Sequence, residues 1–332
     1  MGGGHYDYGV YSSAANMRRM SGTSDFAYSD STLRSAKSTW KAHDTLEPKS
    51  IKNTINGVRE SRDSSDHPES RGIVVIFDDT GSMRRTPPIF QKNLNKLMSM
   101  ILMKSGVEHP QILVGAVGDV TCDAVPLQMS QFESDNNIDE HLRKLVLEGG
   151  GGDGNHESYE LALYAAARLT AMDCYEKRGQ KGYLFIVGDE VSYLTVKKEA
   201  VEKVFGIKEQ SDISLQDIVN ECMEKFNVYF IMPSGTAHWT KPEIREFWMK
   251  YLDQNFRTLD NPEALPELIA SIIAMNEGSE LNTITTELKV VGANSEAIEV
   301  VKRSMKGYVT TNASRSSGII PTSKNKDTVT KL

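Results

Sequence analysis

The fold is decided by Ile73–Met83, IVVIFDDTGSM, where an apolar run ends directly in two aspartates, a threonine, a glycine and a serine. An unbroken apolar run of this kind is typical of a strand that is buried on both faces. Asp78, Thr80 and Ser82 follow at alternate positions, so that one carboxylate and two hydroxyls can point at one centre. Gly81 lets the backbone bend close to that centre. The stretch therefore predicts either a capped turn, since these residue types are common in caps, or a metal-binding loop.

The middle of the chain, from about residue 71 to 278, alternates short apolar runs with segments of helical periodicity. The expected strands are GIVVIFDD, QILVGAVGD, PLQMSQFES, GYLFIVGDE, NVYFIMPS and NFRTLD, with PLQMSQFES at an edge. The expected helices cover residues 90–101, 138–148, 161–172, 215–226, 243–254 and 262–275. Strands that are apolar on both faces and separated by helices predict a mostly parallel α/β sheet with helices on both sides.

The regions on either side of this α/β segment have a different composition. Residues 1–70 form a Ser- and Tyr-rich N-terminal arm, which we expect to be partly ordered because it holds many aromatic side chains. Residues 279–332 form a C-terminal extension that ends in a polar tail, which we expect to be disordered. Residues 56–72 are dense in opposite charges, and either a solvated linker or an ordered arm held by Arg–carboxylate pairs accounts for them.

The overall composition limits the classes of function. The chain of 332 residues carries a formal net charge of −7, which argues against a protein that binds nucleic acid by neutralising phosphates. No apolar run approaches the roughly 20 residues that a membrane-spanning helix needs. The three cysteines are far apart and form no disulfide or metal-binding pattern, which favours a reducing compartment. We therefore expect a cytoplasmic protein without a signal peptide that binds neither nucleic acid nor membrane.

Acidic side chains follow several of the expected strands, at the edge where open parallel sheets bind ligands. They lie in four groups along the chain: Asp78 with Asp79, Asp119 with Asp123, Asp153 with Glu157 in a glycine-rich loop, and Asp189 with Glu190. Four acidic groups at one edge of a sheet repel one another unless a cation lies between them. For Asp119 and Asp123, a second cation site and simple hydrogen bonding within loops both remain open.

At this point the sequence resembles the von Willebrand factor A (vWA) family. The segment FDDTGSM resembles the loop of the metal-ion-dependent adhesion site (MIDAS), usually D-x-S-x-S, with Thr80 in place of the first serine. The segment LFIVGDE places Asp189 where the family has an aspartate after the fourth core strand. The loop GGGGDGNHE is similar to the Gly-Gly-Gly-Asp-x-Pro-Glu form of some branches, including integrin β-type domains and intracellular proteins of bacterial or phage type. The resemblance covers about residues 71–278.

The resemblance implies a Rossmann-like vWA fold with one antiparallel edge strand, and one divalent ion, usually Mg²⁺, or else Mn²⁺ or Ca²⁺. The ligands carried over by position are Asp78, Thr80, Ser82 and Asp189. The glycine-rich loop adds an acid. Counting back from the Ala-Leu pair at 162–163 selects Glu157, but Asn155-His156 replace the family's single proline, so Asp153 stays a second candidate.

Asp78, Glu157 and Asp189 bring three negative charges, against two where the loop supplies a threonine. By charge alone, this set should bind the metal more tightly and attract an incoming carboxylate less strongly. Asp79 is not expected to be a ligand, because the alternate positions select its neighbours.

The main hypothesis for function is a non-catalytic, metal-dependent module that binds a protein partner, which supplies an Asp or Glu to the ion. An AAA+ ATPase is one such partner that the resemblance suggests. One alternative is a metal-dependent hydrolase or phosphotransferase. Against it, the glycine loop lacks a Gly-Lys-Ser/Thr ending, and Thr80 stands where D-x-D-x-T phosphatases have an aspartate. Another alternative is a structural subunit of a homo-oligomeric assembly.

Overall fold

The computed structural model describes residues 4–81, 83–150 and 154–310, without the side chains of Met103 and Lys104. Ser82, Asp153 and the polar tail from residue 311, each the subject of a prediction above, lie outside the described residues.

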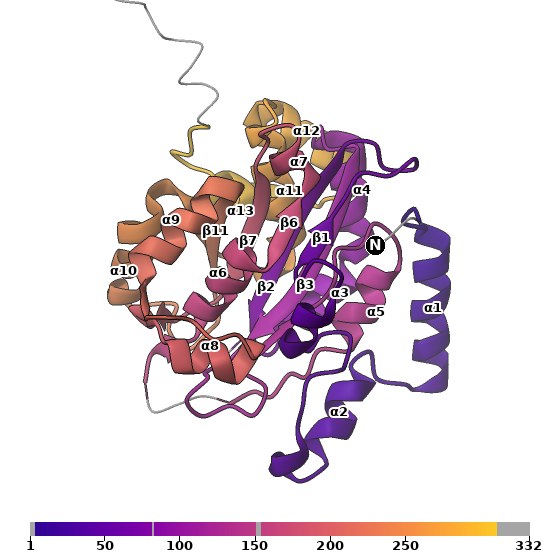
Figure 1. The fold of residues 1–332 in the computed structure, drawn as a ribbon. Helices are drawn as coiled ribbons and strands as arrows, with labels where there is room; N and C mark the ends of the chain where they lie inside the picture. Colours follow the sequence, from indigo (N-terminus) through magenta and orange to yellow (C-terminus); the bar gives the residue numbers. More distant parts are fainter. Residues whose placement is uncertain (1–3, 82, 151–153, 311–332) are drawn as a thin grey trace, which may run out of the picture.

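A six-stranded sheet crosses the middle of the molecule (Figure 1). In spatial order its strands are β12 (Phe256–Leu259), β11 (Phe226–Pro233), β7 (Gly182–Val187), β2 (Ser70–Asp78), β3 (His109–Val117) and β4 (Leu127–Met129). All neighbouring pairs are parallel except β3 with β4, which is antiparallel. The predicted fold class is confirmed: the sheet is mostly parallel, with one antiparallel strand at an edge.

The helices cover the two faces of this sheet because its strands are apolar on both sides. In β2, Ile73, Val75 and Phe77 lie in one hydrophobic core, while Val74 and Ile76 lie in the other. Helices with residues in the first core are α3 (Thr86–Lys92), α4 (Leu94–Lys104), α5 (Asn137–Arg143), α11 (Leu265–Asn276), α12 (Leu281–Val290) and α13 (Ser295–Ser304). Helices with residues in the second are α6 (Tyr159–Arg168), α7 (Asp173–Glu176), α8 (Lys198–Phe205), α9 (Leu215–Lys225) and α10 (Pro242–Leu252). None of the helices in the described residues is long and apolar enough to span a membrane.

Smaller elements complete the chain. Two-stranded sheets join β1 (Arg59–Ser61) to β6 (Thr170–Met172), β5 (His156–Glu157) to β8 (Val191–Ser192), and β9 (Thr195–Val196) to β10 (Ile213–Ser214). Short 3-10 turns are η1 (Lys37–Thr39), η2 (Pro48–Asn53), η3 (Asp253–Asn255) and η4 (Pro262–Ala264). The N-terminal arm contributes α1 (Tyr8–Ser21) and α2 (Ala27–Leu33). Its Tyr6, Tyr11 and Phe26 are buried in the first core, where the Tyr11 hydroxyl donates to the Gln91 carbonyl at 2.5 Å.

The prediction of one long helix over residues 161–172 is wrong at its end. Helix α6 stops at Arg168, and Thr170–Met172 pairs in parallel with Arg59–Ser61. Met172 fits the helical spacing of apolar residues, but it is apolar because it packs against β2. Its sulfur packs where a side chain on Gly72 would lie.

The predicted helix over residues 138–148 is also too long, since α5 ends at Arg143. Beyond it, the backbone of Val146 is bound by the Gln128 side chain, whose amide nitrogen donates to the Val146 carbonyl and whose oxygen accepts from its N–H, both at 2.8 Å. A side-chain amide thus replaces the helical hydrogen bonds that these residues would otherwise make.

The strand order reverses between β2 and β7, because the chain places β3 and β4 on one side of β2 and returns to the other side for β7. In open α/β sheets, ligands bind beyond the carboxyl ends of the strands at such a switch point. Asp78 ends β2, and Asp189 lies two residues after the end of β7. The fold therefore brings the predicted MIDAS loop and the predicted post-strand aspartate to one place.

Candidate metal site

Asp78 is fully buried and has both carboxylate oxygens occupied by hydrogen bonds. Oδ1 accepts from the Thr80 N–H at 2.8 Å and from its hydroxyl at 2.6 Å, and Oδ2 accepts from the Tyr159 hydroxyl. Burial raises the pKa of Asp78 to about 7, with the charge of Asp189 acting in the same direction. The first two predicted ligands, Asp78 and Thr80, therefore lie together in a fixed arrangement. Met83 behind them is buried.

The loop after β2 and the glycine-rich loop are joined through their backbones. The Gly81 N–H donates to the Gly150 carbonyl, and the Gly149 N–H donates to the Asp79 carbonyl, both at 3.1 Å. A side chain on Gly150 would collide with the carboxylate of Asp123 in the loop after β3, so Asp123 would have to move. The two loops that the sequence assigns to one ion are thus in direct contact.

Glu157 is the most unusual group of the site. It lies in β5 beside Ser192 of β8, and its side chain is fully buried. Neither of its carboxylate oxygens has a hydrogen-bond partner among the described residues. Burial raises the pKa of Glu157 to about 11, and the charges of Asp78 and Glu190 add to the shift. The neighbouring His156 is exposed, and its ring stacks on Tyr193.

Asp189 and Glu190 lie at the same edge, next to a histidine that sequence reasoning did not select. Asp189 Oδ2 accepts from the backbone N–H of His238 at 3.1 Å, and Glu190 Oε1 lies 3.4 Å from His238 Nδ1. In the part of the chain that the structure describes, these residues are the one group of three His, Cys, Asp or Glu side chains with ligand atoms all within 4.8 Å of one another. Burial raises the pKa of Glu190 to about 8, with the charges of Asp78 and Asp189 adding to it.

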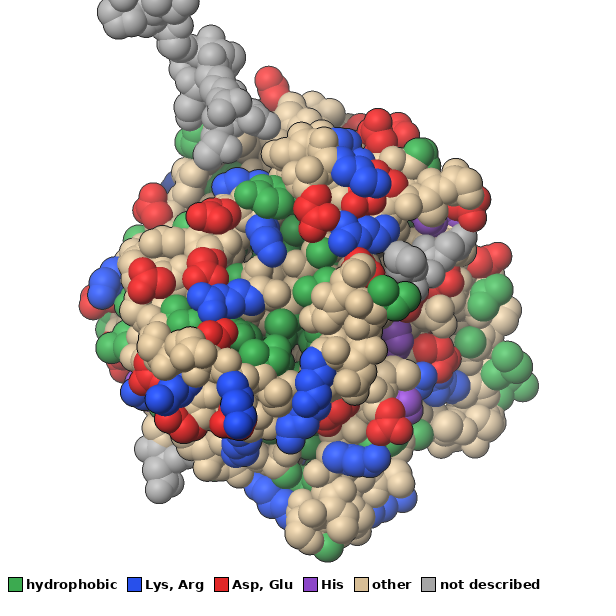
Figure 2. All heavy atoms as spheres, viewed as in Figure 1, with side chains coloured by type: hydrophobic (Ala, Val, Ile, Leu, Met, Phe, Trp, Pro, Cys, Tyr) green, Lys and Arg blue, Asp and Glu red, His purple; other side chains and the backbone are tan. Residues whose placement is uncertain are grey.

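Asp79 was not expected to be a ligand, because the ligand positions alternate along the loop. It is also buried, and neither of its carboxylate oxygens has a hydrogen-bond partner in the described chain. Burial raises the pKa of Asp79 well above its ordinary value, and the negative charges of Asp78 and Asp123 raise it further. Two nearby lysines have other partners: Lys241 Nζ donates to Asn155 Oδ1 at 2.7 Å, and Lys37 pairs with Glu148 at 2.9 Å. Figure 2 shows Lys and Arg interspersed with Asp and Glu over the surface of one face, whereas the excess of acid at this edge is buried.

This donor set fits a hard divalent cation. Oxygen ligands from carboxylates and hydroxyls are those that Mg²⁺, Mn²⁺ and Ca²⁺ take in proteins. Buried carboxylates without partners are otherwise costly, and a cation among them would reverse the direction of their pKa shifts. Of the predicted ligands, the structure brings Asp78, Thr80, Glu157 and Asp189 to one edge, while the placement of Ser82 and Asp153 is not described.

Asp119 and Asp123 make the loop hydrogen bonds that one of the two interpretations left open for them expects. Asp119 accepts from the backbone N–H and the hydroxyl of Thr121, both at 2.8 Å, and from the Tyr193 hydroxyl at 3.0 Å. Asp123 Oδ2 accepts from the Asp119 N–H at 2.6 Å. Both carboxylates therefore bind loop donors and hold the loop after β3 in place.

Sequence reasoning missed Tyr159 and His238. Tyr159 looks like an ordinary core aromatic in the helix pattern, and nothing in the sequence marks its hydroxyl as a donor to Asp78. His238 carried a usable signal, because it follows β11 at the carboxyl edge, where the chain places its other site residues.

No protein-family model matches the sequence, and no curated protein matches it. Solved structures that resemble the chain include the pilus adhesin SpaC from Lactobacillus rhamnosus GG, with a TM-score of 0.45 and 13% identity over 63% of this chain and 30% of the adhesin. Proximal thread matrix protein 1 from the mussel byssus gives 0.40 and 10% identity over 66% of this chain and 47% of that protein. The vWF domain of the type V pili tip protein from Porphyromonas gingivalis gives 0.40 and 10% identity over 63% of this chain and 96% of that domain.

The chain spans less than half the length of the adhesin and of the mussel protein. TM-scores below 0.5 carry no argument about what this chain does. The assignment of a vWA-like Rossmann arrangement rests instead on the strand order and on the single antiparallel edge strand.

Proposed function

We propose that the protein binds one divalent cation, Mg²⁺ in the first instance, at the carboxyl ends of β2 and β7, and uses it to bind a protein partner through an Asp or Glu of that partner. The observation that carries the proposal is the Glu157 carboxyl group, which is fully buried and lacks a hydrogen-bond partner in the described chain, beside the buried Asp78. A cation between these carboxylates accounts for both features.

The residues of the chain have distinct roles in this proposal. Asp78, Thr80, Ser82 and Asp189 hold the ion, with Glu157 or Asp153 as the acidic residue from the glycine-rich loop. Tyr159 would act on the ion only through Asp78, because its hydroxyl donates to Asp78 Oδ2 and so fixes the orientation of that carboxylate. When bound, the ion supplies positive charge and an open coordination position.

The surface beside the site suggests the chemistry of the partner. A cavity of about 310 Å³ adjoins the edge, lined by Val120, Tyr193 and Leu194 among others, and the Leu194 side chain is 61% exposed. Tyr193 connects this cavity to the site, because its ring stacks on His156 next to Glu157. A partner segment with an apolar side chain close to its acidic residue would fill the cavity and reach the ion together.

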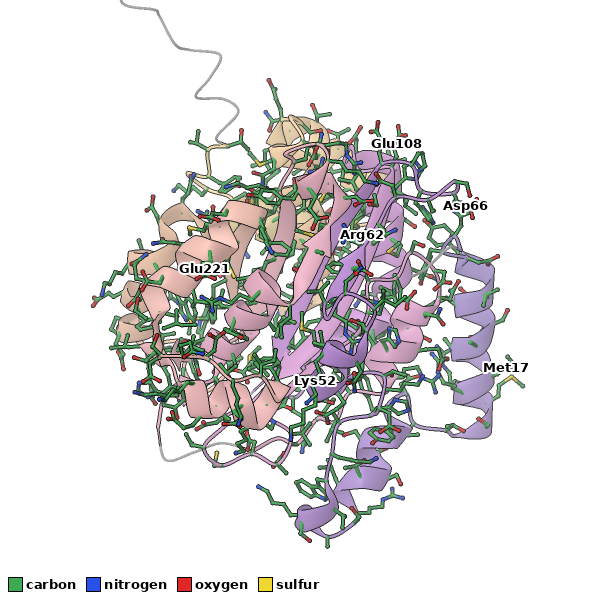
Figure 3. All side chains as sticks on the ribbon, viewed as in Figure 1. Met17, Lys52, Arg62, Asp66, Glu108 and Glu221 are labelled. Carbon is green, nitrogen blue, oxygen red and sulfur yellow. The ribbon has the colours of Figure 1, made fainter. Side chains whose placement is uncertain are left out.

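The test compares capture of partners by the immobilised full chain, from a lysate of its own host cell, for wild type, Asp78→Ala and Asp66→Ala. Asp66 is an exposed aspartate before β2, at the opposite edge of the sheet (Figure 3). Wild type and Asp66→Ala should bind one equivalent of Mg²⁺ by calorimetry and capture the same proteins, and Asp78→Ala and a chelator should each abolish both.

Two results would contradict this proposal. One is a purified wild-type protein that binds no Mg²⁺. The other is capture that survives both the Asp78→Ala substitution and chelation in a protein that circular dichroism shows to be folded.

A second candidate function, a subunit of a homo-oligomeric assembly, is favoured by the outer surface of α1. Met17 is 65% exposed and points away from the domain (Figure 3), and Val10 and Met20 are also exposed. Light scattering on the full chain and on Met17→Glu tests this candidate. A monomer at every concentration would exclude it, and an oligomer that the substitution dissociates would support it.

A further inference from the structure

The geometry points to a transition-metal site of the Zn²⁺ class formed by Asp189, Glu190 and His238, which differs in ligand chemistry from the proposed Mg²⁺ site and shares only Asp189 with it. The inference rests on the side chains after β7 and β11. It does not depend on the loop after β2, on which the proposed function depends.

The three side chains are close enough to bind one metal ion without a change in the backbone. All three ligand atoms lie within 4.8 Å of one another, and His238 Nδ1 is 3.4 Å from Glu190 Oε1. Two ligands on a tetrahedral ion with bonds of about 2.1 Å are about 3.4 Å apart, which matches the observed separation.

One nitrogen of the histidine ring makes no hydrogen bond among the described residues. His238 Nδ1 is buried without a hydrogen-bond partner in the described chain, and the side chain as a whole is only 13% exposed. The backbone N–H of the same residue donates to Asp189 Oδ2, so the loop after β11 is tied to one of the proposed ligands. A buried ring nitrogen that faces two carboxylates is well placed to bind a metal ion.

Groups behind the ligands hold them in position. The Trp248 indole N–H donates to the Glu190 carbonyl at 2.7 Å, which fixes the backbone next to the ligand. Trp248 is itself fully buried and stacks on Phe230 of β11 at 4.0 Å between ring centroids. Such outer contacts commonly set the affinity of metal sites.

The nitrogen ligand decides the class of ion. Imidazole suits Zn²⁺ and its neighbours in the first transition row, whereas Mg²⁺ is bound by oxygen ligands. Three protein ligands of this mixed nitrogen and oxygen kind are typical of zinc sites that keep an open position.

The experiment measures Zn²⁺ affinity by calorimetry and the ligand-field absorption of bound Co²⁺ in the tag-free full chain. His238→Ala should weaken Zn²⁺ binding by at least about tenfold and change the Co²⁺ spectrum, while Mg²⁺ binding is retained. Glu190→Gln, which keeps the shape of the side chain, should weaken Zn²⁺ binding as well and serves as the second variant if His238→Ala does not fold.

The control for histidine binding is His109→Ala. The rings of His5, His67 and His109 pack together, with His109 at the amino end of β3, and form the competing place where zinc could bind. The control should leave the Zn²⁺ affinity and the Co²⁺ spectrum unchanged.

Three outcomes decide the matter. Equal Zn²⁺ affinity in wild type and in folded His238→Ala and Glu190→Gln overturns the inference, as does a loss confined to His109→Ala. A chain that binds Zn²⁺ through His238 but binds no Mg²⁺ supports the inference and contradicts the proposed function.

Discussion

The two edges of the central sheet carry acidic residues in opposite circumstances. At the amino edge, Asp63 accepts hydrogen bonds from Ser70 and forms an ion pair with Arg178 at 2.7 Å. Burial opposes the shift, but these donors hold the pKa of Asp63 down to about 2. At the carboxyl edge, the pKa values of Asp78 and Glu157 are raised instead, to about 7 and about 11.

The difference lies in what balances the charge. Arg62, labelled in Figure 3, lies before β2 and reaches Glu60, Asp173 and Glu176, so the amino edge is neutralised by the chain itself. Among the described residues, no lysine or arginine forms an ion pair with Asp78 or Glu157. The amino edge thus balances its charge within the chain, whereas Asp78 and Glu157 at the carboxyl edge have no such ion pair among the described residues.

The largest expected effect is stabilisation by the ion. At a free Mg²⁺ concentration 100-fold above its Kd, the free energy of unfolding should rise by about 2.7 kcal/mol relative to the chelated protein, because the folded state alone binds the ion. Asp78→Ala should remove this increment, and Asp66→Ala should keep it. Urea unfolding with Mg²⁺ or chelator measures both, and an equal increment in the two variants would place the ion elsewhere.

The second effect is the pH dependence of the free energy of unfolding when a chelator keeps the protein free of metal. Glu157 has an ordinary pKa of 4.5 and a folded pKa of about 11, so the folded state retains a proton that the unfolded state releases. Its contribution to stability is fully present below pH 4.5 and is lost as the pH rises toward 11.

Without metal, wild type should therefore lose up to about 2.7 kcal/mol more stability than Glu157→Gln between pH 6 and pH 8. Urea unfolding at both pH values in chelator gives the difference. An equal change in the free energy of unfolding for the two proteins would show that the folded and unfolded states do not differ in the protonation of Glu157 over this pH range.

Much of this contrast could be predicted from the sequence, because it depends on strand pattern. Apolar runs that end in acids placed Asp78, Asp119 and Asp189 at one edge, and the structure puts each there. For the amino edge, the sequence left two interpretations of residues 56–72, and pairing of arginines with carboxylates was one of them. The ion-pair partners themselves, such as Arg178, are far away in sequence and carry no local signal.

The two helices predicted too long share a physical cause: the spacing of apolar residues along the chain does not show which distant residues they contact in the fold. Met172 kept helical spacing but belongs to a strand that packs against Gly72. Val146 has the pattern of a helix, yet its backbone is held by the Gln128 amide. His238 could have been found only by extending the rule for strand ends to every strand, including β11.

The third prediction tests the charge of the carboxyl edge directly. Glu157→Thr removes one carboxylate from the proposed ligand set and leaves a hydroxyl. Mg²⁺ affinity should fall by about tenfold, or about 1.4 kcal/mol, because the number of charged ligands tunes the affinity of hard cations. Calorimetric titration of the two proteins measures this, and equal affinities would show that Glu157 neither binds the ion nor lies near it.

The smallest expected effect lies at the amino edge, where Asp63→Asn removes the charge but keeps the shape of the side chain. Because Asp63 and Arg178 are partly exposed, the loss of stability at pH 7 should be only about 1 kcal/mol. The folded pKa of Asp63 lies below its ordinary value of 3.8, so its contribution is present above pH 3.8 and disappears as the pH falls toward 2. Urea unfolding at pH 7 and pH 3 should therefore show wild type and variant converging in acid, whatever the Mg²⁺ concentration, while Asp66→Asn matches wild type at both. An Asp63→Asn protein whose deficit depended on Mg²⁺ would mean that the two edges are coupled, and the contrast between a self-neutralised edge and one that depends on an ion would fail.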